Sequence, residues 1–108
     1  MRSVSAKTAK RNREYHKLRE LYLDNVPRCE IRWDSRCLGV ATEIDHKVRR
    51  NTAPHLVLDL RNFQAACRNC HHNKEHNPEE AKERGLWLTA REVEELPDVP
   101  FDPGVDSD

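Results

Sequence analysis

The chain has 108 residues, of which 36% are hydrophobic and 35% are charged. This length allows one domain, and the lean apolar content predicts a small interior that needs a disulfide or metal staple. Met1 is followed by polar and basic residues instead of a secretory signal, and no apolar run approaches the roughly 20 residues of a membrane span. We therefore expect a cytoplasmic, reducing setting and no membrane partner.

Charge is distributed unevenly along the chain. Residues 1–50 carry 13 Lys and Arg against 7 Asp and Glu, whereas residues 51–108 carry 6 against 12. From Glu92 to the C-terminus there are seven acids and no base. A basic body suits a polyanionic partner, because phosphate neutralisation supplies most non-specific DNA affinity. A solvated basic surface without a partner is the alternative interpretation.

The first predicted element is an amphipathic helix over residues 6–24. Tyr15, Leu18 and Tyr22 recur at helical spacing, and Pro27 follows the end of the pattern. Its C-terminal half is expected to pack on the core. The helix offers to solvent or phosphate the basic residues Lys7, Lys10, Arg11 and Arg13. His16 is interpreted as a surface histidine.

A loop rich in turn residues follows over residues 28–42, and Trp33 is expected to cover it. Residues 41–48 alternate apolar and polar side chains, which predicts a strand. A short strand over residues 56–60 and an extended segment from Asn62 to Cys67 are predicted next. His55, beside Pro54 in the intervening turn, is predicted to lie on the surface.

The last third of the chain predicts short helices. One covers residues 69–76, and Asn77 is predicted to cap a restart at Pro78 that Gly85 ends. Thr89 and Glu92 predict a capping box for a helix over residues 90–96. We assign residues 1–96 to one domain and residues 97–108 to a flexible acidic tail.

Four cysteines predict a structural metal site. Two residues separate Cys67 from Cys70, a spacing that directs both sulfur atoms at one ion, whereas seven residues separate Cys29 from Cys37. Four thiolates complete a closed tetrahedral site, and we predict structural Zn²⁺. Two disulfides or free buried thiols are the alternative.

Three separated motifs carry a family resemblance. Glu43-Ile44-Asp45-His46, Asn62 and Cys67-x-x-Cys70-His71 resemble the HNH endonuclease family over about Cys29 to Lys74. The resemblance implies a small α+β fold with a ββα-metal core, an N-terminal helix and a four-cysteine zinc knuckle. It also implies that Asp45 and His71 hold a catalytic divalent cation and that His46 is the general base. Asn62 would orient the loop and the His46 imidazole.

The chemistry of these residue types fits those roles. Asp45 and His46, as neighbours on a strand, point to opposite sides unless twist brings them together, so one can face a metal and the other a water. A neutral imidazole can accept a proton near pH 7. The mixed oxygen and nitrogen ligands accept Mg²⁺, Mn²⁺ or another divalent cation. His72, with or without His76, is the alternative to His71, because these two residues stand four apart on one helical face.

Basic residues lie close in sequence to these motifs. We predict that they contact the DNA backbone with little sequence specificity, and the set is Lys47, Arg49, Arg50, Arg61, Arg68 and Lys74. For any single one of them, a solvated charge is the alternative.

The leading interpretation is a metal-dependent DNA endonuclease or nickase. A non-catalytic zinc-stapled nucleic-acid-binding or adaptor module is the second class, and a nuclease acting on RNA or branched DNA is the third. The resemblance extends to many small phage and bacterial proteins. By association alone it implies a cytoplasmic location, which is the host-cell cytoplasm if the chain is phage-encoded, and in that case phage genome-packaging proteins as partners.

Overall fold

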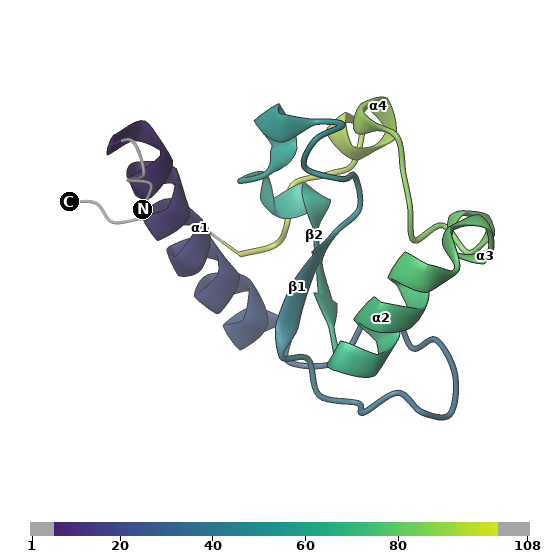
Figure 1. Ribbon diagram of the computed structural model, residues 1–108. Coiled ribbons are helices and arrows are strands. Elements are labelled where there is room, and N and C mark those ends of the chain that lie inside the picture. Colours follow the sequence, from purple (N-terminus) through teal and green to yellow (C-terminus); the bar gives the residue numbers. More distant parts are fainter. Residues whose placement is uncertain (1–5, 102–108) are drawn as a thin grey trace, which may run out of the picture.

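A two-stranded antiparallel hairpin lies at the centre of the fold. The computed structural model describes residues 6–101. Strands β1 (Glu43–His46) and β2 (Phe63–Ala66) pair with Glu43 opposite Ala66 and His46 opposite Phe63. Helix α1 (Ala6–Asn25) lies on one side of the hairpin and α2 (Arg68–His76) on the other (Figure 1). The predicted small α+β fold is confirmed.

Helix α1 packs on the hairpin through its C-terminal half. Tyr22 is buried beside Phe63, with ring centroids 5.7 Å apart, and Leu18 contacts the same apolar cluster. The helix ends at Asn25, as expected just before Pro27, where the residue preceding the proline is biased away from helical angles. The predicted helix over residues 6–24 is confirmed, and His16 is exposed.

The segment between the strands is not extended. Residues 56–60 were predicted as a short strand, but this prediction is wrong because the chain forms two 3₁₀ turns, Pro54–Leu56 and Leu60–Asn62. Asp59 caps the second turn by accepting from the Arg61 backbone N–H. Of the apolar residues that suggest a strand, Leu56, Val57 and Leu60 are buried in or beside these turns. His55 is exposed and pairs with Glu94, as expected of a surface residue.

Three short helices follow β2 within the described residues. Helix α2 begins at the second cysteine pair, and α3 (Pro78–Glu83) begins with Pro78 in its first turn. The Asn77 side chain does not cap α3 as predicted, because its Nδ2 donates to the Asn73 carbonyl. Gly85 ends α3 with φ +78°, a left-handed conformation that favours glycine. Thr89 and Glu92 form the predicted capping box of α4 (Ala90–Glu94).

The segment after α4 contributes to the core. Val99 and Phe101, which belong to the predicted tail, pack against the apolar cluster that contains Tyr22 and Phe63. The ring centroids of Phe101 and Tyr22 lie 5.6 Å apart. The predicted tail continues through residues 102–108, which lie outside the described residues. Within residues 6–101, no helix is both long and apolar enough to cross a bilayer.

Candidate metal and nuclease sites

The four cysteines converge on one point, as their spacing predicts. The Sγ atoms of Cys29, Cys37, Cys67 and Cys70 all lie within 4.8 Å of one another. Tetrahedral zinc with thiolate ligands needs sulfur atoms about 3.8 Å apart, given a Zn–S bond of about 2.3 Å. The cluster therefore fits a closed four-sulfur site.

Backbone amides point at these sulfur atoms. The N–H groups of Trp33, Leu38 and Gly39 donate to the Sγ atoms of Cys70, Cys67 and Cys37 over 3.3, 3.4 and 3.4 Å. Burial raises the pKa of the Cys67 thiol, but the amide donors of Leu38 and Cys70, together with the side chains of Cys70 and Cys29, lower that pKa to about 7. Such donors stabilise thiolates, the form that binds a metal.

Residues 28–42 reach the second cysteine pair through an irregular loop. Arg32, between Cys29 and Cys37, and Gly39, two residues after Cys37, take left-handed angles, with φ +48° and φ +84°. Trp33 is buried in the apolar cluster that contains the cysteines, as predicted. Beside them the Arg84 guanidinium lies 4.0 Å from the Trp33 ring centroid.

A second site lies where β1 meets α2. His71 Nδ1 and Asp45 Oδ1 are 2.9 Å apart, and Glu75 stands one turn after His71. One ligand atom from each of these three residues lies within 4.8 Å of the other two. Carboxylate and imidazole ligands of this kind suit a divalent cation with open coordination positions.

The position of Glu75 was not predicted from the sequence. The sequence does contain a signal for it, because Glu75 stands four residues after His71 and residues four apart on a helix are neighbours on its surface. His71 lines the same pocket as Asp45, whereas His72 and His76 do not. The rings of His72 and His76 lie 4.1 Å apart on an exposed part of α2.

His46 faces this pocket from the end of β1. Its Nε2 lies 3.2 Å from the Val57 carbonyl oxygen, which can only accept a hydrogen bond. Nε2 therefore carries the proton, and Nδ1 is left as the acceptor. Burial lowers the pKa of His46, and nearby Arg50 lowers it further.

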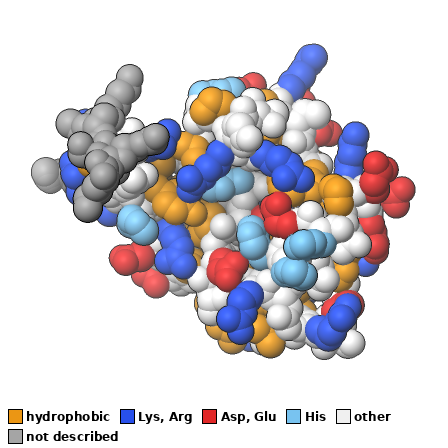
Figure 2. Space-filling model, viewed as in Figure 1, with side chains coloured by type: hydrophobic (Ala, Val, Ile, Leu, Met, Phe, Trp, Pro, Cys, Tyr) orange, Lys and Arg blue, Asp and Glu red, His pale blue; other side chains and the backbone are white. Residues whose placement is uncertain are grey.

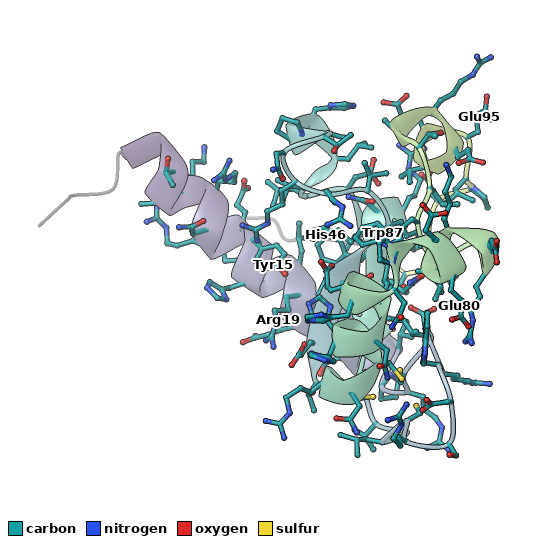
Figure 3. All side chains as sticks on the ribbon, turned by 45° about the vertical axis from the view of Figure 1, so that its right-hand side comes forward. Tyr15, Arg19, His46, Glu80, Trp87 and Glu95 are labelled. Atoms are coloured by element: carbon teal, nitrogen blue, oxygen red, sulfur yellow. The ribbon has the colours of Figure 1, made fainter. Side chains whose placement is uncertain are left out.

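Two aromatic rings hold the His46 imidazole. Tyr15 of α1 stacks on it, with ring centroids 5.8 Å apart, and Phe63 of β2 meets it edge-on at 5.4 Å. Figure 3 shows His46 between Tyr15 and Trp87, which come from opposite ends of the chain. These contacts fix the plane of the ring.

The Asn62 side chain holds the loop between the strands through hydrogen bonds. Its buried Oδ1 accepts from the Val48 N–H over 2.8 Å, and its Nδ2 donates to the Leu56 carbonyl over 3.1 Å. Both bonds close the loop that begins directly after His46. The predicted role in orienting the loop fits this geometry, and any effect on the imidazole passes through the loop.

Lys74 is the least expected member of the site. Its side chain is fully buried, and its amine contacts Asp45 Oδ2 and the His46 carbonyl. The Trp87 ring covers it, with the amine 3.7 Å from the ring centroid. Lys74 therefore cannot reach a nucleic-acid backbone, which corrects its assignment to the DNA-contacting set.

The other basic residues of that set divide into two groups. Lys47 donates to the Arg61 carbonyl, and Arg61 itself is bound to Asp59 and to the Glu94 carbonyl, so both side chains form hydrogen bonds within the fold. Arg49, Arg50 and Arg68 are exposed. Arg49 and Arg50 line the same pocket as Asp45 and His71. Basic side chains lie beside histidine and acidic side chains near the centre of the face shown in Figure 2.

Comparisons with known proteins agree with this geometry. Residues 27–77 match the family model described as HNH endonuclease, a segment that contains all four cysteines and both strands. Searches of curated proteins and of solved structures found no match.

Proposed function

Because residues 27–77 match the HNH endonuclease family model, we propose that this chain is a metal-dependent DNA endonuclease or nickase. The observation that carries the proposal is the pocket lined by Asp45, His46 and His71, which we call the catalytic pocket. In it the His46 imidazole, whose Nε2 is engaged by the Val57 carbonyl, lies beside a set of residues that could hold a cation. A zinc module that only binds nucleic acid has no need of these groups together.

In this proposal the chain's own residues carry out the proton transfer and bind the phosphate. His46 would take a proton at Nδ1 from the attacking water as the new bond to phosphorus forms. The phosphorus–oxygen bond opposite then breaks, and the leaving oxygen takes a proton from solvent. Arg49 at the pocket rim would bind the oxygens of the scissile phosphate. A divalent cation held by Asp45, His71 and Glu75 would neutralise charge on the leaving oxygen.

The four-cysteine cluster has a separate, structural role in this proposal. Its four sulfur atoms would complete the coordination of a tetrahedral ion and leave no position for substrate. We assign Zn²⁺ to it, and Mg²⁺, Mn²⁺ or another divalent cation to the pocket.

A plasmid nicking assay tests the proposal. Supercoiled DNA is incubated with the full chain of known zinc content, with and without added Mg²⁺ or Mn²⁺. We expect nicking that needs the added ion, and His46→Ala should lower the rate by about 10² to 10⁴-fold while binding of DNA and zinc persists. Replacement of exposed His72 by Ala is the matched control and should leave the rate unchanged. Unchanged nicking by the His46 variant would refute the assigned base.

A further inference from the structure

A second hollow continues from the catalytic pocket toward the N-terminal helix. Its lining consists of Arg11, Arg50, Asn51, Pro54 and Val57. Arg50 and Asn51 also line the catalytic pocket, so the two hollows join at these residues. We call the second hollow the α1 groove.

The α1 groove is basic, and its arginines are not neutralised by the protein. Its lining contains no carboxylate. Arg11 and Arg50 are exposed, and neither forms an ion pair with a carboxylate of residues 6–101. Other arginines of the same region do form such pairs, namely Arg36, Arg49, Arg61, Arg84 and Arg91.

The position of Arg50 is restrained although its charge is free. Its guanidinium lies 5.3 Å from the centroid of the Tyr15 ring, and that ring stacks in turn on His46. A planar guanidinium held in this way loses little freedom when it binds a phosphate through two parallel hydrogen bonds. Arg50, which forms one side of the α1 groove, is therefore held at a fixed position relative to His46, the proposed general base.

We propose that the α1 groove binds backbone phosphate of the substrate strand next to the scissile phosphate, with Arg11 and Arg50 as the binding residues. This inference rests on the proposed nuclease function, because it assumes that the scissile phosphate sits in the adjoining pocket. Helix α1 precedes residues 27–77, so this chain adds its own substrate contact to the matched domain.

The inference is tested by DNA binding in the full chain carrying His46→Ala, which keeps the DNA intact. Arg11→Ala and Arg50→Ala are compared with Arg13→Ala and Arg68→Ala, using fluorescence anisotropy of a labelled duplex over a series of KCl concentrations with Mn²⁺ present. Arg13 lies on the same helix but about 200° around its axis from Arg11. Arg68 is exposed on α2, outside the groove. Circular dichroism verifies that each variant is folded.

We expect Arg11→Ala and Arg50→Ala each to weaken binding about fivefold to tenfold. Each should also reduce the slope of log affinity against log salt by about 0.9. The two control variants should change both quantities less. Equal losses for all four variants, or no loss for any, would overturn the inference.

The nuclease proposal is tested separately, by measuring DNA cleavage by the protein that retains His46. Cleavage combined with groove variants that behave like the controls would refute the groove alone. Absence of cleavage combined with the expected binding losses would refute the enzyme and leave a nucleic-acid-binding groove.

Discussion

The amine of Lys74 and the carboxylate of Asp45 form an ion pair that water does not reach, since both side chains are at most 1% exposed. Burial lowers the pKa of Lys74, while the Asp45 charge opposes this effect. The other oxygen of the same carboxylate contacts His71. Asp45 therefore links the buried Lys74 ammonium group to the ligand set proposed for the divalent cation.

Replacing Lys74 by Met should destabilise the protein by about 3–5 kcal/mol, because it leaves the buried Asp45 carboxylate without its partner. Urea unfolding in the absence of added metal measures this loss. The double variant Asp45→Asn with Lys74→Met should be more stable than Lys74→Met alone, since neither charge then remains buried. A double variant as unstable as the sum of its parts would contradict this coupling.

Cleavage should persist below the ordinary histidine pKa of about 6.5. His46 acts as a base only when neutral, and burial lowers its pKa, so the rate should fall only as the pH drops through that lowered value. The pH profile is measured at saturating Mn²⁺, because the Asp45 hydrogen bond raises the pKa of His71 and makes the proton compete with the metal. Tyr15→Ala exposes the imidazole and should move the acid limb toward pH 6.5. A wild-type limb above pH 6.5 would contradict the assignment.

Glu75→Gln should raise the Mn²⁺ concentration needed for half-maximal nicking about tenfold, as expected when a metal site loses a carboxylate. The maximal rate at saturating Mn²⁺ should change little, because His46 and its contacts remain. Glu83→Gln removes an exposed carboxylate from α3, outside the pocket, and serves as the control. If both variants need the same Mn²⁺ concentration as the wild type, Glu75 is not a ligand.

Removal of the cysteine-bound ion should unfold the protein. Structural zinc contributes about 10–16 kcal/mol in small zinc peptides, which exceeds the stability that a core of this size can supply. Cys67→Ser should therefore lose zinc and its cooperative unfolding transition, measured by metal analysis and circular dichroism. Asp45→Asn should retain about one zinc per chain. Full zinc content in the Cys67 variant would argue against the four-sulfur site.

Local sequence signals predicted the elements that carry the two sites. The Cys67 and Cys70 spacing, the alternation around Asp45 and His46, and the capping box at Thr89 each involve residues a few positions apart. Their geometry is set by backbone conformation, so it could be inferred without knowledge of the tertiary fold. The false strand at residues 56–60 shows the limit of this approach, because a short apolar run can be buried in turns as well as in a strand.

The remaining parts of the site depend on contacts between distant segments. The Leu88 N–H donates to the Lys47 carbonyl over 2.9 Å, and this long-range bond brings the neighbouring Trp87 over Lys74. Nothing near Lys74 in the sequence distinguishes it from an exposed lysine. The contact between Tyr15 and His46 likewise depends on the packing of α1 against the hairpin.

The two tryptophans of the chain differ in what they contact. Trp33 packs among the cysteines, whereas Trp87 packs against the edge of that cluster and also contacts the Arg49 guanidinium and the Lys74 amine. Trp87, which lines the pocket of Asp45 and His71, is thus a native optical probe of that pocket. Phenylalanine replacement of Trp33 would leave the Trp87 emission as a signal of ion uptake there, without any attached dye.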